Sequence, residues 1–358
     1  MKAAVLSQGS LSSKWTIDAM KEYFDEVDDL NIKHMEINFS GNKAQILYKG
    51  EPLPRYDCIF SKGSFRYANL LKTFTILING DSYMPIGPDA FTIAHDKLLT
   101  QLELQKANIP MPTTYMASTI GAARTILERL HYPIIMKFPQ GTQGKGVLFA
   151  ESFASASSIL DALSYLRQPF LIQEYIETGG TDVRAFVVGD KVVAAYQRRA
   201  SVKEKRANIH AGGQGEMIDL DDATIRLAIK AAKAVGASIC GVDILIGHKG
   251  PVVIEINSSP GLQGVTKYTG VNVAQKIAKY LFDQTTKFKS EHHGKKAEKI
   301  LSTIENVDKE QQLITSPDFR GSRILLPEVI SRIASLKEDD DYEFTARKGE
   351  ITIKKFKI

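Results

Sequence analysis

Two apolar runs joined by a short turn constrain the fold of this chain more than any other feature. Gly241–Ile246 and Pro251–Asn257 flank a Gly-His-Lys-Gly turn, and acidic residues alternate with aliphatic ones in both runs. This alternation predicts two antiparallel strands. A hairpin centred near the turn lysine places Asp243 opposite Glu255, with Asn257 on the same face. Two carboxylates and an amide are therefore expected to converge.

These three side chains predict a metal site. Facing carboxylates destabilise a hairpin by up to about 1 kcal/mol unless something neutralises them. Oxygen ligands without histidine or cysteine suit a hard cation, and magnesium typically bridges protein carboxylates to nucleotide phosphates. The alternative is a solvated acidic strand face. The regular alternation with Val242, Ile244, Ile254 and Ile256 favours the metal site over that alternative.

A glycine-rich loop, Gln140–Gly146, lies between two further predicted strands, Pro133–Phe138 and Val147–Glu151. Its three glycines allow backbone amides to approach an anion, and Lys137 and Lys145 add positive charge. The loop has neither the Lys-Ser/Thr pair of a Walker A motif nor the spacing of a dinucleotide-binding loop. We interpret it as a mobile phosphate-binding flap, with an ordinary hairpin loop as the alternative.

Two other segments add polar groups. Gln173–Ile176 is a short extended segment that could present backbone donors and acceptors to a purine edge. The loop Arg206–Gly213 supplies a cation, an amide and a tight turn. His210 in this loop is interpreted as a structural, hydrogen-bonding residue rather than a general base.

The Gly-Asp pair at 189–190 predicts a tight hairpin. Pairing the residues on either side of it places Asp182 and Arg184 on one face with Arg199, and turns Arg198 to the other face. Arg184 and Arg199 are therefore candidates for clamping a phosphate or a carboxylate, since a planar guanidinium suits both. A salt-bridged sheet face is the alternative.

Composition limits the possible classes of protein. The 358 residues are 43% hydrophobic and 24% charged, which excludes wholesale disorder and collagen, and the net charge of +5 allows anionic ligands without requiring nucleic acid. Cys58 and Cys240 belong to no CxxC pair, so no zinc ribbon or disulfide framework is expected. No apolar run reaches the length of a signal sequence or a membrane span, and we expect a cytoplasmic protein without a membrane partner.

The chain is expected to contain several domains. Alternating strands and helices near the N-terminus predict a small α/β domain with a largely parallel sheet, in which Lys2–Leu6, Ile32–Ile37, Cys58–Phe60 and Thr75–Ile78 are strands. A strand-rich α+β region follows, closed by a helix at Val271–Phe282. The lysine-rich stretch after it is interpreted as an exposed linker. The predicted segments are 1–92, 93–285, 286–299 for the linker and 300–358 for a small terminal module.

The ordered motifs resemble those of the ATP-grasp superfamily, and within it the RimK-like amino-acid ligases. They are Lys-Phe-Pro-Gln-Gly-Thr-Gln-Gly-Lys-Gly-Val at 137–147, Gln-Glu-Tyr-Ile at 173–176, Asp-Val-Arg at 182–184, Arg-Arg-Ala at 198–200, Asn-Ile-His at 208–210, Gly-Val-Asp-Ile-Leu at 241–245 and Glu-Ile-Asn-Ser-Ser-Pro-Gly-Leu at 255–262. The likeness covers roughly residues 1–285. It implies an α/β and α+β protein with an N-terminal pre-ATP-grasp domain, a two-subdomain ATP-grasp domain and a small β-rich module.

The resemblance also implies roles for individual residues. Lys137 and Arg199 are assigned to catalysis. The expected nucleotide-binding residues are Lys97, Lys137, Gly144, Lys145, Gly146, Glu174, Tyr175, Ile176, Asp182, Arg206 and Asn208. Asp243, Glu255 and Asn257 are the expected magnesium ligands, with manganese as an alternative metal.

The implied reaction joins a carboxylate to an amine through an acyl phosphate and releases ADP and phosphate. Glutamate is the expected amino acid, because the Arg-Arg-Ala and Asn-Ile-His strings are similar to those of the glutamate-adding branch. Ala211 departs from the arginine that often follows Asn-x-His in that branch, so a ligase for another amino acid is an alternative. The acceptor carboxylate, of a protein, a coenzyme or a small molecule, is not identified by the sequence.

The C-terminal residues are similar to the swapped-hairpin AbrB-type fold, in the segments 323–330, 339–345 and 349–354. A module this small buries little core, so we expect it to form a homo-oligomer, dimer or tetramer, by strand exchange. A nucleotide-sensing, DNA-binding regulator is the alternative. The acidic cluster Glu338–Asp341 argues against a DNA-binding surface.

Overall fold

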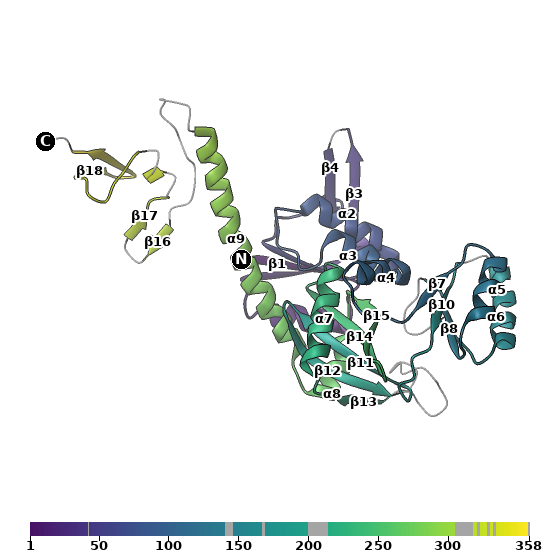
Figure 1. The fold of residues 1–358 in the computed structure, drawn as a ribbon. Helices are drawn as coiled ribbons and strands as arrows, with labels where there is room; N and C mark the ends of the chain where they lie inside the picture. Colours follow the sequence, from purple (N-terminus) through teal and green to yellow (C-terminus); the bar gives the residue numbers. More distant parts are fainter. Residues whose placement is uncertain are drawn as a thin grey trace. The chain divides into compact units, whose positions relative to one another are not determined.

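The computed structural model divides the chain into two units, Met1–Thr286 and Lys287–Ile358 (Figure 1). It describes residues 1–41, 43–139, 146–166, 169–199, 214–304, 318–320, 323–327, 330–331 and 334–356. Among the helices of this described part, none is long and apolar enough to cross a membrane. The predicted mixture of α/β and α+β architecture is confirmed.

The N-terminal part of the first unit contains a parallel sheet in the order β2-β1-β6. Its strands are β1 (Lys2–Ser7), β2 (Glu26–Asn31) and β6 (Cys58–Ser61), and its helices are α1 (Leu11–Met20) and α2 (Ala68–Ile78). Ser10 caps α1 by accepting a hydrogen bond from the backbone of Ser13. Leu6, Met20 and Phe60 are buried in the resulting core.

Of the predicted N-terminal strands, Thr75–Ile78 is wrong and Ile32–Ile37 is confirmed only from Met35 onward. Thr75–Ile78 forms the last turn of α2, because Leu71, Phe74, Thr75 and Ile78 are buried at helical spacing. Ile32–His34 is a 3-10 turn, and the strand β3 begins only at Met35. An antiparallel sheet of β3 (Met35–Ser40), β4 (Lys43–Tyr48) and β5 (Glu51–Pro52) projects from this part of the unit (Figure 1).

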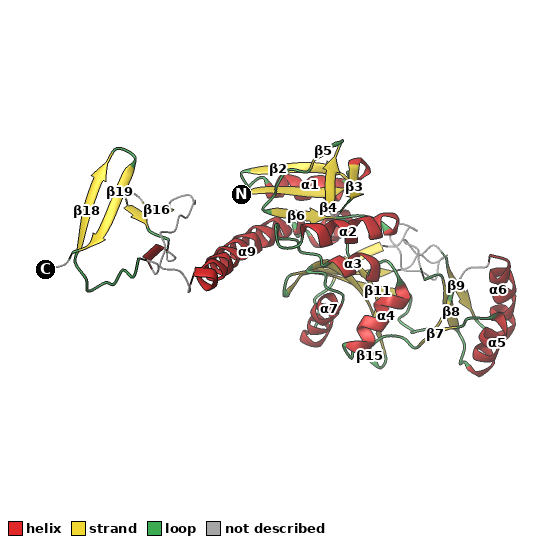
Figure 2. Ribbon diagram, turned by 90° about the horizontal axis from the view of Figure 1, so that it is seen from above, coloured by secondary structure: helices red, strands yellow, loops and turns green. Residues whose placement is uncertain are grey.

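A four-stranded antiparallel sheet has the order β7-β10-β8-β9. Its strands are β7 (Thr114–Met116), β8 (Ile134–Lys137), β9 (Val147–Ala150) and β10 (Leu171–Glu174). The helices α5 (Ile120–Arg129) and α6 (Phe153–Leu166) lie side by side on one face of it (Figures 1 and 2). Leu127, Met136 and Leu160 are fully buried in a separate core beneath these helices.

A five-stranded antiparallel sheet has the order β13-β12-β11-β14-β15. Its strands are β11 (Thr181–Val188), β12 (Lys191–Arg199), β13 (Gln214–Met217), β14 (Ile239–Gly247) and β15 (Gly250–Asn257). The helix α7 (Asp222–Ala234) packs against four of these strands, and α8 (Leu262–Thr269) packs against β12 and β13. Tyr268 of α8 stacks on Tyr196 of β12, with ring centroids 5.8 Å apart.

A β-bulge determines the pairing of the acidic hairpin. Gly247 pairs with Gly250 and Ile244 with Val253, so an unbroken ladder would place Asp243 opposite Ile254. The register shifts by one residue at this point, and Asp243 pairs with Glu255. The predicted pairing of the two acids is therefore confirmed, although the bulge that produces it was not expected.

A second bulge makes the predicted register of β11 and β12 wrong. Val188 pairs with Lys191 as expected, but the register shifts between Phe186 and Val187. Asp182 consequently pairs with Arg198. Arg198 shares the face of Asp182 and Arg184, while Arg199 points to the opposite face.

Two shorter helices, α3 (Pro88–Ile93) and α4 (Lys97–Lys106), precede the four-stranded sheet. The long helix α9 spans Val273–Ile304, so the predicted linker 286–299 is helical and the helix does not end at Phe282. Lysine, glutamate, alanine and glutamine are good helix formers, and Lys279–Asp283 is an i,i+4 ion pair of this helix. The remaining strands form two antiparallel pairs, β16 (Asp318–Arg320) with β17 (Arg323–Leu325) and β18 (Tyr342–Arg347) with β19 (Glu350–Lys355).

Candidate active site

A row of charged side chains crosses one face of the five-stranded sheet. Arg198 lies opposite Asp182, Arg184 lies opposite Asp243, and Asp243 lies opposite Glu255. Residues paired across neighbouring strands share a face, so four adjacent strands present these five side chains together. The sequence predicted a shared face for Asp182 and Arg184 and another for Asp243 and Glu255, but it predicted neither that these two faces are continuous nor that Arg198 belongs to them.

Two arginines neutralise Asp243. Arg184 donates from Nε to Oδ1 of Asp243 at 2.6 Å and from Nη2 to Oδ2 at 2.5 Å. Arg198 makes a bidentate pair with Asp182 and also places Nη2 3.0 Å from Oδ2 of Asp243. Burial alone would raise the pKa of Asp243, which is 3% exposed, but the two guanidiniums hold this pKa below its ordinary value. The two arginines therefore partly offset the repulsion that is expected between Asp243 and Glu255.

Glu255 differs from Asp243 because no side chain that the structure describes forms an ion pair or hydrogen bond with it. Burial raises its pKa, and the nearby charge of Asp243 raises it further. Asn257 lies at the end of the same strand, with Nδ2 3.5 Å from Oδ2 of Asp243. The group therefore contains a carboxylate that has no ion pair or hydrogen bond within the described ranges, next to a second carboxylate.

This donor set fits a hard cation. The expected ligands are two carboxylates and an amide whose oxygen can turn inward, with no nitrogen or sulfur donor in this predicted set. No group of three or more His, Cys, Asp or Glu side chains that could hold a metal occurs in the described ranges. A cation here would thus need further oxygens, as magnesium does when it keeps water and binds phosphate oxygens.

Two lysines lie near Glu255 and come from different elements. Lys137, at the end of β8, is 7% exposed and donates from Nζ to Oε1 of Gln173 at 2.8 Å. Gln173 is fixed in turn by donating to Oγ1 of Thr114 at 2.6 Å. Burial and, to a smaller extent, the charge of Lys97 lower the pKa of Lys137 to about 8, while the charge of Glu255 opposes this shift.

The start of α4 is tied to the end of β8. The backbone N–H of Lys97 donates to the carbonyl of Pro139 at 3.0 Å, and Asp96 caps the helix by accepting from two backbone N–H groups. This contact explains why the charge of Lys97 acts on both Lys137 and Glu255. The predicted phosphate-contacting lysines are therefore near each other and near the predicted metal ligands.

The predicted flap is described only at its end. The backbone N–H of Phe138 donates to the carbonyl of Gly146 at 3.3 Å, which closes the base of the loop. Gly146 has φ +74°, and a Cβ there would lie 2.6 Å from the Phe138 ring. Gly144 and Lys145 lie outside the described residues, as do Arg206 and Asn208.

Replacing Gly146 by alanine is expected to lower the free energy of unfolding by about 1–2 kcal/mol, because alanine is strained at this φ and clashes with the ring. The control is Gly121→Ala in α5, where nothing lies within 4 Å of the added carbon. That variant is expected to be neutral or slightly more stable. Urea unfolding compares the two, and equal stability of both variants would contradict the prediction.

The segment 174–176 connects the two antiparallel sheets. The backbone N–H of Glu174 donates to the carbonyl of Thr113 at 2.9 Å, and its side chain is exposed. Tyr175 packs edge-on against Phe149 with ring centroids 5.2 Å apart. Ile176 lies so close to Gly247 that a Cβ on this glycine would be 2.7 Å away. The segment is thus fixed at both ends beside the β14–β15 turn.

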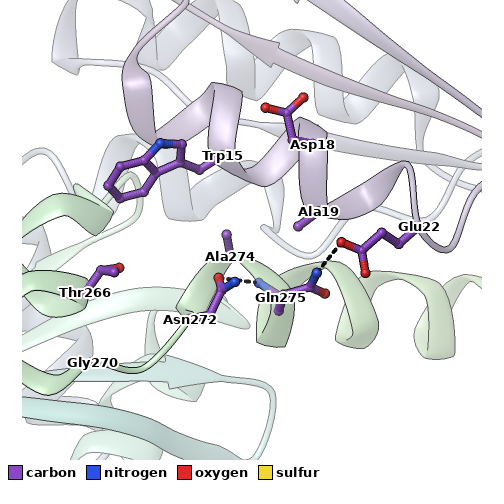
Figure 3. Close-up of a pocket in the computed structure, with 9 residues that line it drawn as sticks. All are labelled: Trp15, Asp18, Ala19, Glu22, Thr266, Gly270, Asn272, Ala274 and Gln275. Carbon is purple, nitrogen blue, oxygen red and sulfur yellow. Dashed lines mark hydrogen bonds between the residues drawn. The ribbon is translucent and has the colours of Figure 1, made fainter.

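A pocket of about 360 Å³ lies between α1 and the turn from α8 to α9 (Figure 3). Trp15, Asp18 and Glu22 line it from α1, and Gln275 of α9 donates a hydrogen bond to Glu22. None of the predicted site residues lines this pocket. It therefore does not form part of the charged row.

The electrostatic balance of the site favours a polyanion accompanied by a cation. The four cationic side chains, Lys97, Lys137, Arg184 and Arg198, exceed the three carboxylates by one charge, and a bound divalent cation would raise this excess. Phosphate groups are well suited to such a surface, because lysines and a hard cation together compensate several negative charges.

Comparison with known proteins identifies the family. A model of the RimK-like ATP-grasp domain matches residues 94–281. A probable alpha-L-glutamate ligase of Thioalkalivibrio sulfidiphilus is 36% identical, over 82% of this chain and all of that protein. One from Vibrio cholerae is 34% identical, over 82% of this chain and all of that protein.

Solved structures share the fold at low identity. A RimK domain ATP-grasp protein from Sphaerobacter thermophilus has a TM-score of 0.61 at 19% identity, over 78% of this chain and 99% of its own. The ATP-grasp ligase PsnB, complexed with a minimal precursor, Mg and ADP, has a TM-score of 0.62 at 19% identity, over 80% of this chain and 98% of its own. The chain thus belongs to the RimK-like ATP-grasp family of ATP-dependent ligases.

Proposed function

We propose that this ligase uses magnesium and ATP to join the amino group of L-glutamate to a carboxylate of an acceptor. The observation that carries the proposal is the charged row, in which Asp243 is held ionised by two arginines and Glu255 has no partner among the described residues. The names of the relatives, probable alpha-L-glutamate ligases, support glutamate as the amino acid. Another amino acid remains the alternative.

Each part of the site has a proposed role in binding. Lys97 and Lys137 bind phosphate oxygens, and the segment 174–176 borders the base. Asp243, Glu255 and Asn257 hold magnesium, which when bound neutralises phosphate charge and orients the transferred group. Asp182 acts through Arg198, because both of its oxygens already accept hydrogen bonds from that arginine.

The proposed reaction has two steps. A carboxylate oxygen of the acceptor attacks the γ-phosphorus, the bond to the β-phosphate breaks, and ADP leaves. The neutral amine of the amino acid then attacks the acyl carbon, the C–O bond to phosphate breaks, and the amine loses a proton. The residues of this chain mainly position the charged groups and compensate their charge, so no nucleophilic serine or cysteine is needed.

Incubation with magnesium, ATP, glutamate and a metabolite extract tests the proposal. ADP and phosphate should be released, and one acceptor should gain the mass of one glutamate residue. Release of AMP and pyrophosphate would exclude the acyl phosphate. A panel of twenty amino acids separates a glutamate ligase from a ligase for another amine.

Nucleotide affinity is expected to fall as pH rises through about 8, because Lys137 has a pKa of about 8 in the free protein and binds phosphate only when protonated. Bound phosphate raises this pKa, so the dissociation constant should rise by up to about tenfold per pH unit above 8. Calorimetric titration with magnesium and a non-hydrolysable ATP analogue between pH 7 and 9.5 measures this dissociation constant. In Lys137→Arg the pH dependence should disappear, and a flat profile in the unaltered protein would rule out the assignment.

We also propose that the second unit mediates homo-oligomerisation. In the β18–β19 hairpin, Phe344 pairs with Ile353 and Ala346 with Ile351, so one face is apolar. Phe344 is 67% exposed and Ile351 is 60% exposed, and an isolated two-stranded hairpin is marginally stable in water. A second copy of this hairpin is the proposed cover.

The oligomer proposal predicts that Phe344→Asp halves the molar mass of the full chain in light scattering after gel filtration. Thr345→Asp, on the other face of the same strand, serves as the control and should leave the mass unchanged. A monomeric mass for the unaltered chain would refute the proposal.

A further inference from the structure

Lys62 is a buried lysine for which the described part of the chain provides no acidic partner. It follows β6 directly and is 5% exposed. Among the contacts that the structure describes, its ammonium makes one, with the ring of Phe60 at 5.7 Å from the centroid. Burial lowers its pKa to about 8, and no charged group contributes to the shift. A buried cation without a counter-charge costs free energy of folding, so stability does not explain this residue.

Lys62 lies where the parallel sheet meets the loop that follows the proposed metal ligands. Its backbone N–H donates to the carbonyl of Leu6 at 2.7 Å, beside the carboxyl end of β1. The next N–H, of Gly63, donates to Oγ of Ser259 at 2.9 Å. Ser259 is two residues beyond Asn257. The carboxyl ends of parallel strands are also the edge at which α/β sheets bind ligands.

Other polar groups at this junction lack partners. The Oγ atoms of Ser61 and Ser258 are buried, and neither has a hydrogen-bond partner within the described part of the chain. Nε2 of His95 is also buried and has no hydrogen-bond partner there, although the His95 ring forms a hydrogen bond with the backbone of Gly63. Most buried polar groups in proteins are hydrogen-bonded, so three such atoms, on the chain neighbours of Lys62 and Ser259 and on a residue that contacts Gly63, favour a ligand at this junction.

We propose that Lys62 binds a carboxylate of one substrate at this junction between β6 and the loop after β15. A carboxylate supplies the missing counter-charge, and it accepts hydrogen bonds from serine hydroxyl groups. The ligase has two sources of this group, the incoming amino acid and the acceptor. This inference rests on the proposed function, because glutamate, the proposed amino-acid substrate, is the first probe.

The first test is stability. Lys62→Met keeps the length of the side chain and removes its charge, Lys62→Arg keeps the charge, and Lys230→Met removes an exposed lysine of α7 as the matched control. The ligand-free Lys62→Met protein is expected to melt about 2 °C or more above the unaltered chain, while the control does not change. A lower melting temperature for Lys62→Met would show a structural lysine and overturn the proposal.

The second test separates the substrates in steady-state kinetics of the full chain. Lys62→Met should raise the KM for one carboxylate substrate by about tenfold or more, with the KM for ATP within about twofold and Lys62→Arg close to the unaltered chain. A rise for glutamate assigns the carboxylate to the amino acid, and a rise for the acceptor assigns it there. Unchanged KM values for both would overturn the inference, whatever the melting temperature.

The inference can fail independently of the proposed function. If the unaltered chain shows no glutamate-dependent release of ADP, the glutamate assignment fails. Melting shifts with a panel of amino acids and dicarboxylates, in the presence of magnesium and a non-hydrolysable ATP analogue, then decide the role of Lys62. A shift in the unaltered chain and in Lys62→Arg but not in Lys62→Met supports carboxylate binding, while equal shifts or no shift in all three contradict it.

Discussion

Replacing Glu255 by glutamine is expected to reduce the turnover of ATP on the order of a thousandfold while the protein remains folded. The amide keeps the shape of the side chain but removes the one carboxylate of the charged row without a partner among the described residues. Because burial and the charge of Asp243 raise the pKa of Glu255, the negative charge of this side chain costs free energy of folding. The neutral variant should therefore be at least as stable as the unaltered chain.

Three measurements together test this role of Glu255. Release of ADP gives turnover, titration with magnesium gives the dependence on metal, and urea unfolding gives stability. The control is Glu216→Gln on β13, an exposed acid of the same sheet, which should change none of them. If Glu255→Gln lowered the free energy of unfolding as well as turnover, Glu255 would be a structural residue. Full turnover in this variant would exclude Glu255 as a metal ligand.

The sequence was sufficient to predict the acidic hairpin, because alternation of acids with aliphatic residues determines both the strands and the face that the acids share. Asp243 does pair with Glu255. The sequence did not predict how this pairing arises, however. The turn contains two residues, which alone would place Asp243 opposite Ile254, and a bulge at Ile254 restores the expected register. A bulge of this kind has no local signature, because Ile254 is as suitable for a regular strand as its neighbours.

Longer-range features were less predictable. The chain 286–299 is polar and rich in lysine, which is typical of an exposed linker and equally of an exposed helix, and it is helical here. Thr75–Ile78 has the β-branched composition of a strand but completes α2, because its apolar residues continue the buried stripe of that helix. Local composition was ambiguous in both cases, and packing decided the outcome.

The partners of Lys137 also depend on the tertiary fold. Gln173 lies 36 residues from Lys137 along the chain, and Thr114 lies 59 residues from Gln173. The antiparallel pairing of β7, β10 and β8 brings the three residues together. The sequence predicted a phosphate-binding lysine from its place before a glycine-rich loop. It offered no signal for the hydrogen bonds that orient this lysine.

Arg198→Met is expected to lower the free energy of unfolding by about 3–5 kcal/mol and to abolish most turnover, whereas Arg199→Met should change stability by less than about 0.5 kcal/mol. Arg198 is 7% exposed and pairs with both Asp182 and Asp243, so its loss leaves Asp182 without an ion-pair partner among the described residues and Asp243 with Arg184 alone. Burial already raises the pKa of Asp182 to about 6 against the effect of Arg198, and removal of Arg198 should raise it further.

Urea unfolding at pH 7 and release of ADP compare the two methionine variants, and Arg198→Lys separates charge from geometry. Lysine keeps the charge but cannot bind one carboxylate through two donors while also reaching the other, so intermediate stability is expected. The contrast between the neighbouring arginines follows entirely from the one-residue shift between Phe186 and Val187. If Arg199→Met were the damaging variant, β11 and β12 would pair without the bulge, and Arg199 would take the place in the charged row that the unshifted hairpin predicts.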